Sequence, residues 1–456
     1  MDERGEMKYR GLHILFALGL ILFTCCQGRR KPPDIIIPPS TGVNTVKKFT
    51  LKNSMPVLIL EEPDNRIVTL DVWVNTGSVN EPNEINGVSH FLEHMLFKGT
   101  ETRGVGEVDS IIESVGGLWN AGTSMEFTHY YLTLATPFTS IGIDMLSDVL
   151  ANSSLDPAEV EKERQVILEE YFRKEDNPSQ FLATKAFNQS FEKSPYKFPV
   201  LGTPETINAI TPEKLRDYYI SRYAPENMVL VIAGGVNAEE ILPVLEEKFG
   251  SLERSFDPGS NKPETGSIRR TGVSREFEKP VKEAYLLITL PAPDFSVAQE
   301  VYAYDLLSYI LGEGRSSRFY SVVKEKKHLV SSISAYYPTH RSDGMFFIFA
   351  TLDYSRKEEV LEAILVEISQ IIEKPVEPEE LQKAKRMLTN HCIFSQETTS
   401  GRTSEIGFYY TLTGSTEFQE TYLEEIRKIT PEDVKSVAQK YLDPKQANIF
   451  IVRPEK

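Results

Sequence analysis

The sequence predicts an α+β protein whose body consists of two domains with the same fold. From residue 46 onwards, β-branched apolar runs alternate with amphipathic helix patterns. The segment 251–272 lacks this periodicity and is rich in Gly, Pro and Ser, which is typical of an interdomain linker. Residues 211–233 and 430–452 share one order: Thr-Pro, an amphipathic helix, a Pro turn and a closing apolar strand. Two unrelated helix–strand units are the alternative, but an internal duplication explains the shared order better.

Composition excludes several classes of protein. The chain has 456 residues, of which 40% are apolar and 25% charged, so collagen-like and wholly disordered chains are excluded. Its 50 basic and 66 acidic side chains give a formal net charge of −16. This charge argues against nucleic acid as a partner, because such binding depends on neutralising phosphates. The three cysteines are too few for a scaffold held by disulfides, so each domain needs its own apolar core.

The N-terminus is interpreted as an export signal. Residues 14–23 form a ten-residue apolar run, too short for the ~20 residues of a membrane-spanning helix but typical of a signal sequence. Met7 is a better start than Met1, because it leaves basic rather than acidic residues ahead of the run. The run ends at Cys25 and Cys26, which resembles a bacterial lipobox with Cys25 as the expected lipidation site and Cys26 as the alternative. An ordinary cleaved signal or a retained anchor would fit the same run.

The expected location is the periplasmic face of a bacterial cell envelope, where an exported protein is held by a lipid anchor. The segment after the cysteines contains four prolines and no apolar periodicity, so we expect a semi-extended tether. The chain is therefore divided into a signal peptide at 1–25, a tether at 26–45, an N-terminal domain at 46–250, a linker at 251–272 and a C-terminal domain at 273–456.

Two histidines one helical turn apart predict a metal site in the N-terminal domain. His90, Glu93 and His94 spell H-x-x-E-H, the inverted form of the zincin motif, within a predicted helix capped by Ser89 or Asn86. Positions i and i+4 share one helix face, so both imidazoles can reach one ion with the carboxylate beside them. Their neighbours are apolar, and buried imidazoles need a partner, which a metal supplies. Two core histidines satisfied by hydrogen bonds are the alternative.

A third ligand is expected from the helix that begins at Asp156 and Pro157. Catalytic zinc usually has three protein ligands and one open position. Asp156 is the expected N-cap, with Glu159 completing a capping box. Further along the helix, Glu163 and Glu170 lie on an apolar stripe, where two carboxylates exceed what solubility requires. Either could be the ligand, and for each one alone a surface acid is the alternative.

These motifs together resemble the pitrilysin (M16) family of zinc peptidases, particularly its short members related to mitochondrial processing peptidase. The likeness extends from Val46 to the C-terminus. It implies two homologous domains, each a mostly antiparallel sheet packed with helices. It also implies one zinc ion per chain, held by His90, His94 and Glu170, with Glu163 supporting the site from behind the ligands.

The resemblance further implies a zinc metalloendopeptidase. Zinc would activate a water molecule, and Glu93 would take its proton and pass it to the leaving amine. Residues 116–134 are similar to the family's substrate-binding edge strand and the strand after it, where Asn120 and Ala121 would bond to an extended peptide. His129, in the second of these strands, is interpreted as a packing or supporting residue.

The C-terminal domain departs from the family pattern. The segment 312–332 resembles the one in which an Arg and, seven positions later, a Tyr reach the substrate, but Lys324 and Ser331 stand there. Lys lacks the planar fork of Arg, and Ser lacks the reach of a phenol. Family members close a chamber from four such domains and this chain supplies two, so we expect a dimer. A heterodimer with a paralogue that carries the Arg/Tyr pair is favoured over a homodimer that uses Lys324.

Two functions are consistent with these features. The first is a zinc-dependent endopeptidase or oligopeptidase that hydrolyses unfolded or short peptides inside a closed chamber formed by dimerisation. The second is a non-catalytic peptide-binding or scaffold subunit of a related complex, as in family members that have lost the metal site. The intact motif together with Glu170 favours the enzyme.

Overall fold

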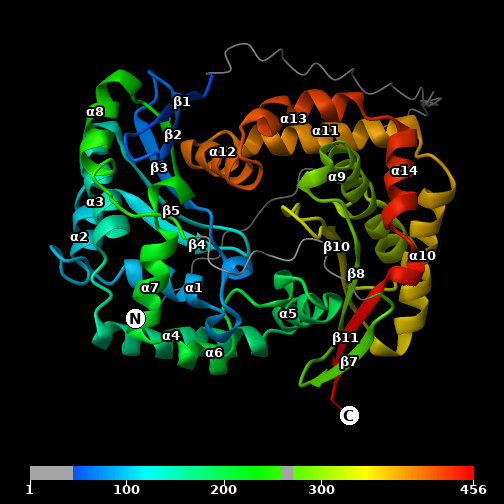
Figure 1. The fold of residues 1–456 in the computed structure, drawn as a ribbon. Helices are drawn as coiled ribbons and strands as arrows, with labels where there is room; N and C mark the ends of the chain where they lie inside the picture. Colours follow the sequence, from blue (N-terminus) through cyan, green and yellow to red (C-terminus); the bar gives the residue numbers. More distant parts are fainter. Residues whose placement is uncertain (1–44, 258–270, 456) are drawn as a thin grey trace, which may run out of the picture. The chain divides into compact units, whose positions relative to one another are not determined.

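The computed structural model describes residues 45–257 and 271–455, which contain two β-sheets with matching strand order (Figure 1). The first sheet, in order, consists of β1 (Lys47–Thr50), β2 (Pro56–Glu61), β6 (Met228–Gly234), β3 (Ile67–Val74), β5 (Thr128–Ala135) and β4 (Leu118–Thr123). The second consists of β7 (Ser274–Lys279), β11 (Asn448–Pro454), β8 (Ala284–Pro291), β10 (Met345–Leu352) and β9 (Ser332–Tyr336). Each contains one parallel pair, β2 with β6 and β7 with β11, and its other neighbours are antiparallel. Without β1 the two sheets are equivalent, which confirms the predicted pair of mostly antiparallel domains.

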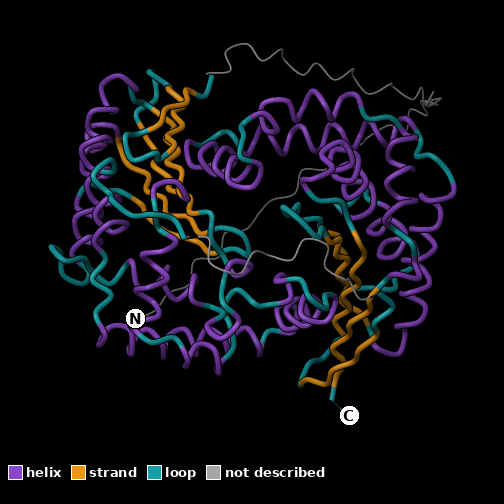
Figure 2. Tube along the Cα trace, viewed as in Figure 1, coloured by secondary structure: helices purple, strands orange, loops and turns teal. Residues whose placement is uncertain are grey.

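Helices pack against both sheets (Figure 2). Those of the first half are α1 (Val88–Leu96), α2 (Glu107–Ser114), α3 (Thr139–Asn152), α4 (Pro157–Asp176), α5 (Pro178–Ser190), α6 (Pro204–Ala209), α7 (Pro212–Arg222) and α8 (Ala238–Lys248). Those of the second half are α9 (Ala298–Gly312), α10 (Lys357–Glu373), α11 (Pro378–Ser395), α12 (Thr399–Thr413), α13 (Glu417–Lys428) and α14 (Pro431–Tyr441). The two similar sequence segments become α7 followed by β6 and α14 followed by β11, each with the Thr-Pro cap at the helix start.

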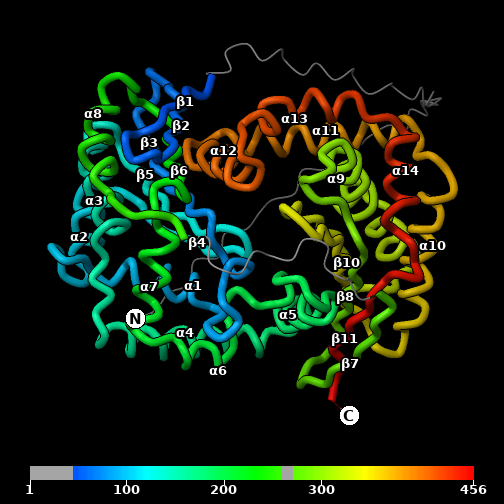
Figure 3. Tube along the Cα trace, viewed as in Figure 1, coloured from blue at the N-terminus to red at the C-terminus, as the bar shows by residue number. Residues whose placement is uncertain are grey.

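One helix from each half packs on the sheet of the other half, which the sequence did not reveal. Helix α5 packs on β8 and β11, and α12 packs on β3 and β6 (Figure 3). The α12 contact is close, because a Cβ on Gly407 would come within 2.1 Å of Trp73 Nε1. Thr399 and Thr69 also share a hydrogen bond of 2.7 Å across it. The central strand β3 is therefore buried on both faces.

The two helices of the predicted metal site begin differently from one another. Asp156 caps α4 as predicted, while Glu159 pairs with Lys162 instead of completing a capping box. The expected caps of α1 are wrong, because the N-cap is Gly87, with φ of 97°. The buried Glu81 carboxylate accepts hydrogen bonds from the amides of Gly87 and Ser89. The Asn86 side chain donates to the same carboxylate at 2.7 Å. Glu81, which lies outside the helix, therefore caps the N-terminus of α1 in place of a residue at the helix start.

Part of the predicted linker belongs to the first half. The Arg254 guanidinium lies 4.0 Å from the Tyr219 ring centroid and donates to the carbonyl oxygen of Ala151 at 2.5 Å. The predicted signal, the lipidation site at Cys25, nearly all of the tether and the linker positions 258–270 lie outside the described residues. Among the helices that the structure describes, none combines the length and apolar character needed to cross a bilayer.

Candidate metal centre

The predicted metal donors meet between α1 and α4. Glu170 Oε2, from α4, lies 3.6 Å from His90 Nε2 and 3.7 Å from His94 Nε2, both from α1. Within the described residues, these three form the one group of His, Cys, Asp or Glu side chains whose donor atoms could share a metal, all within 4.8 Å. Of the two acids that the sequence offered, the structure therefore places Glu170 beside the histidines as the third donor.

The donor set fits a zinc ion. A tetrahedral zinc with bonds of about 2.0–2.2 Å separates its ligand atoms by about 3.3–3.6 Å, close to the observed spacings. Burial and the charge of His94 lower the pKa of His90, which favours the neutral imidazole that binds metal. Burial alone would raise the pKa of Glu170, but the charge and hydrogen bond of Lys174 help to hold it below its usual range. Lys174 Nζ lies 3.1 Å from Glu170 Oε1, which leaves Oε2 to face the histidines.

Glu163 supports His94 from behind. Its Oε1 lies 2.8 Å from His94 Nδ1, and its Oε2 lies 2.8 Å from Lys98 Nζ. Burial alone would raise the pKa of Glu163, but the hydrogen bonds from Lys98 and His94 hold it below its usual range. The ionised carboxylate accepts the Nδ1 proton, so Nε2 keeps its lone pair for a metal and the ring is held in place.

Glu93 lies beside the donors without joining them. The hydroxyl of Thr123, at the end of β4, donates to Glu93 Oε2 and orients the carboxylate. Burial raises the pKa of Glu93, and the Thr123 hydrogen bond offsets only part of that rise. A carboxylate with a raised pKa next to a candidate metal position has the properties of a general base.

Strand β4 forms an edge of the first sheet, as expected for a strand that binds an extended peptide. Leu118, at its start, is 74% exposed. Of the two residues predicted to contact peptide, Asn120 is exposed and its Oδ1 accepts a hydrogen bond from the Ala121 amide at 2.9 Å. A peptide that pairs with this edge would have to displace the Asn120 side chain to reach that amide.

The two residues of the second half that were predicted to contact substrate interact with other residues of the same half. Lys324 lies on the π-helix η7 (Phe319–Lys326), where its Nζ is 4.9 Å from the Tyr320 ring centroid. Ser331 precedes the edge strand β9, and its amide and hydroxyl both donate to the carbonyl oxygen of Thr351, at 2.8 and 3.2 Å. Neither residue forms a hydrogen bond or ion pair with the metal donors among the described residues.

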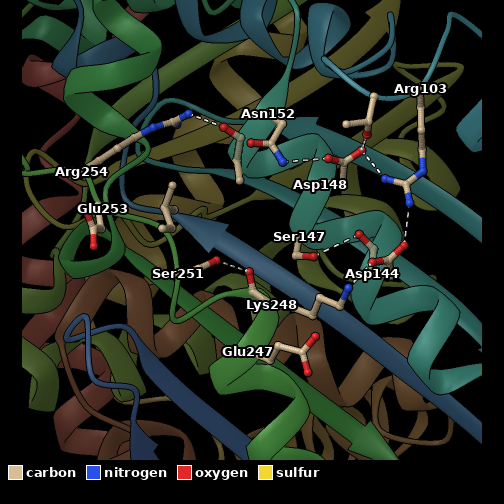
Figure 4. A pocket seen from close by; sticks show the side chains of 13 residues that line it. Arg103, Asp144, Ser147, Asp148, Asn152, Glu247, Lys248, Ser251, Glu253 and Arg254 are labelled. Atoms are coloured by element: carbon tan, nitrogen blue, oxygen red, sulfur yellow. Dashed lines mark hydrogen bonds and ion pairs between the residues drawn. The ribbon is translucent and has the colours of Figure 1, made fainter.

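A polar pocket of about 570 Å³ lies between α3 and α8, and none of the metal donors lines it (Figure 4). Asp144 pairs there with Arg103 at 2.6 Å and with Lys248 at 2.7 Å, and Arg103 also binds Asp148. Because these charges neutralise one another, the pocket has the character of a surface ion-pair network.

Sequence reasoning missed four residues that act on the site through others: Glu81, Lys98, Thr123 and Lys174. Lys174 was detectable, because it follows Glu170 by one helical turn. Lys98 follows His94 by the same spacing but contacts it only through Glu163 on another helix. Glu81 and Thr123 lie in separate elements, so their contacts depend on the tertiary fold.

Comparison with known proteins gives a consistent family assignment. The family "Insulinase (Peptidase family M16)" matches residues 56–204, and "Peptidase M16 inactive domain" matches residues 209–388. An uncharacterised zinc protease of Rickettsia felis is 30% identical over 390 residues, covering 86% of this chain and 93% of the relative. One from Bacillus subtilis is 28% identical over 394 residues, covering 86% and 95%.

Solved structures show the same fold. A protease from Helicobacter pylori matches with a TM-score of 0.84 at 23% identity, covering 90% of this chain and 100% of that one. A peptidase M16 inactive domain from Pseudomonas fluorescens matches with a TM-score of 0.83 at 18% identity, covering 90% and 99%. With two halves of one fold and with relatives that span nearly its whole length, the chain belongs to the M16 family of peptidases.

Proposed function

We propose that the chain is a zinc-dependent endopeptidase or oligopeptidase that hydrolyses unfolded or short peptides. The observation that carries this proposal is the convergence of His90 Nε2, His94 Nε2 and Glu170 Oε2 beside the carboxylate of Glu93. Three protein donors leave one position of a tetrahedral zinc open for catalysis. The names of the relatives as zinc proteases support the same chemistry.

The residues of the site have two roles, which are to orient the side chains around the zinc position and to transfer a proton. When bound, zinc lowers the pKa of a water molecule and polarises a carbonyl. Glu163 fixes the ring of His94, and Thr123 aims the Glu93 carboxylate. Glu93 takes a proton from the attacking water and returns it to the leaving amine. Strand β4 holds the peptide extended through backbone hydrogen bonds.

The proposal includes a second chain that closes the chamber. Because Lys324 and Ser331 replace the expected Arg and Tyr, a related partner that carries this pair is favoured, with a homodimer as the alternative. The same two residues are the observation that favours a second candidate function, a non-catalytic peptide-binding or scaffold subunit. We also retain the proposal of an exported protein anchored by lipid at Cys25 on the periplasmic face.

The substitution Glu93→Gln tests the proposed chemistry. Zinc content should be unchanged, because Glu93 is not a donor, while peptide hydrolysis should fall on the order of 10²–10⁴-fold. Glu169→Gln, at an exposed acid of α4 next to Glu170, is the matched control and should keep the wild-type rate. Hydrolysis by Glu93→Gln at the wild-type rate would contradict the mechanism. Folded, zinc-loaded wild-type protein that cleaves no peptide would favour the non-catalytic subunit or a missing partner.

A further inference from the structure

The face of the first sheet that meets α12 carries a polar pair that the proposed mechanism does not use. Asp71, on β3, is fully buried, and its Oδ1 lies 3.1 Å from His129 Nδ1 on β5. The other oxygen of Asp71 has no hydrogen-bond partner among the described residues. A buried carboxylate requires a hydrogen-bond donor, and the Nδ1–H of His129 supplies one to Asp71.

The ring of His129 is held in one orientation. It packs against the tilted ring of Trp73, with 4.4 Å between the ring centroids, and stacks on Tyr131, with 5.4 Å. With Nδ1 directed at Asp71, Nε2 lies toward β4, 3.3 Å from the position that a Cβ on Gly122 would occupy. The side chain keeps 17% exposure, and Nε2 forms no hydrogen bond within the described residues. The ring therefore presents one unused polar atom above the edge strand.

The register of the sheet connects this atom to the peptide-binding edge. Trp73 pairs directly with His129, and His129 pairs directly with Gly122, so the three form one row across β3, β5 and β4. A peptide strand that pairs with β4 continues this row by one residue, whose side chain lies on the same face. Since Gly122 has no side chain, β4 places nothing between His129 and the peptide residue of that row.

We propose that His129 and Gly122 form a subsite that selects an acidic side chain in a peptide bound along β4. This inference rests on the proposed function, because it requires a peptide to pair with that edge. In this subsite the His129 ring lies between two carboxylates: its Nε2–H donates to a Glu or Asp of the peptide, and its Nδ1–H donates to Asp71. Such charge-assisted hydrogen bonds are about twice as strong as neutral ones, so Gln binds less well. A Lys in the same row brings only N–H donors and cannot accept a hydrogen bond from Nε2–H.

The test uses internally quenched fluorogenic peptides in which each Gln around the cleavage site is replaced in turn by Glu or Lys. The zinc-loaded full chain should cleave one Glu peptide with kcat/KM about tenfold above its Gln parent, and the matching Lys peptide more slowly than that parent. His129→Phe keeps an aromatic ring in the stack but removes the donor, so the preference should disappear. His391→Phe makes the same change at an exposed histidine of α11 and should keep the preference.

Failure of this inference differs from failure of the proposed function. Cleavage without a preference for Glu at any position, or a preference that survives His129→Phe, overturns the subsite and leaves the peptidase standing. If no peptide is cleaved, the chain alone lacks peptidase activity, and peptide binding tests the subsite instead. Fluorescence anisotropy with zinc-loaded Glu93→Gln protein should then show tighter binding of one Glu peptide than of its Gln parent, and equal binding overturns the proposal.

Discussion

Helices α4 and α11 occupy equivalent places in the two halves. The comparison distinguishes residues that both halves share from the candidate metal donors, which only the first half has. Each begins with a proline, Pro157 or Pro378, and each carries a buried cation seven positions later, Arg164 or Lys385. Both cations donate to carbonyl oxygens at the C-terminal end of a neighbouring helix, α6 in the first half and α13 in the second. The duplicated fold thus keeps this buried contact in both halves.

The same alignment of the two helices shows where the halves differ. Ala384 stands at the position of Glu163, and His391 at the position of Glu170. The second half therefore retains the sheet and the buried cation without the carboxylates. The same fold therefore forms in the second half without the carboxylates of the candidate metal centre.

The largest expected effect is a loss of zinc affinity that occurs when a histidine of the first half, but not of the second half, is replaced. His94→Ala removes a donor and should lower zinc affinity more than about 100-fold, since loss of a mere supporting contact already costs 10–100-fold. His391→Ala, in the second half, should leave zinc affinity unchanged. Isothermal titration of zinc into metal-free protein measures both, and equal losses in the two variants would contradict the assignment.

The next largest effect is a loss of stability that should occur in both halves. Arg164→Met and Lys385→Met each leave buried carbonyl oxygens unsatisfied, which should cost about 2–3 kcal/mol of stability. Thermal unfolding of the metal-free protein should show a lowered Tm for both variants. A Tm equal to the wild type in either variant would show that the two contacts are not equivalent.

A smaller loss of zinc affinity is expected when Glu163, which supports the candidate ligand His94, is changed. Glu163→Gln replaces the anion that accepts the His94 Nδ1 proton and pairs with Lys98, so zinc affinity should fall about 10–100-fold. The Tm of the metal-free protein should fall as well, because Gln loses the charge that pairs with Lys98 and keeps the pKa of Glu163 low. Zinc affinity within twofold of the wild type would show that Glu163 is structural only.

The smallest expected effect concerns pH. Glu93 must be ionised to act as a base, burial raises its pKa, and the Thr123 hydrogen bond lowers it. Thr123→Val removes the lowering contribution, so the acid limb of kcat/KM should move to higher pH, by up to about one unit. Rates well above that limb should be unchanged. A limb that stays in place or moves to lower pH would contradict the role of Glu93.

Local patterns predicted much of this molecule. The apolar run at β3, the Asp156 cap of α4 and the repeated helix–strand segments depend on neighbouring residues, and the structure has them where they were expected. The cap of α1 could not be predicted, because Glu81 reaches it from outside the helix. Nor could the sequence predict that α5 and α12 each pack on the sheet of the other half, or that Thr123 donates to Glu93, because these contacts depend on the tertiary structure.

The most direct test of the central claim is to titrate zinc into metal-free protein while peptide hydrolysis is followed in the same sample. If the first half alone carries the catalytic metal, activity should rise in proportion to added zinc and reach its plateau at one zinc per chain. Hydrolysis that persists in fully metal-free protein, or that does not change as one equivalent of zinc binds, would contradict the account.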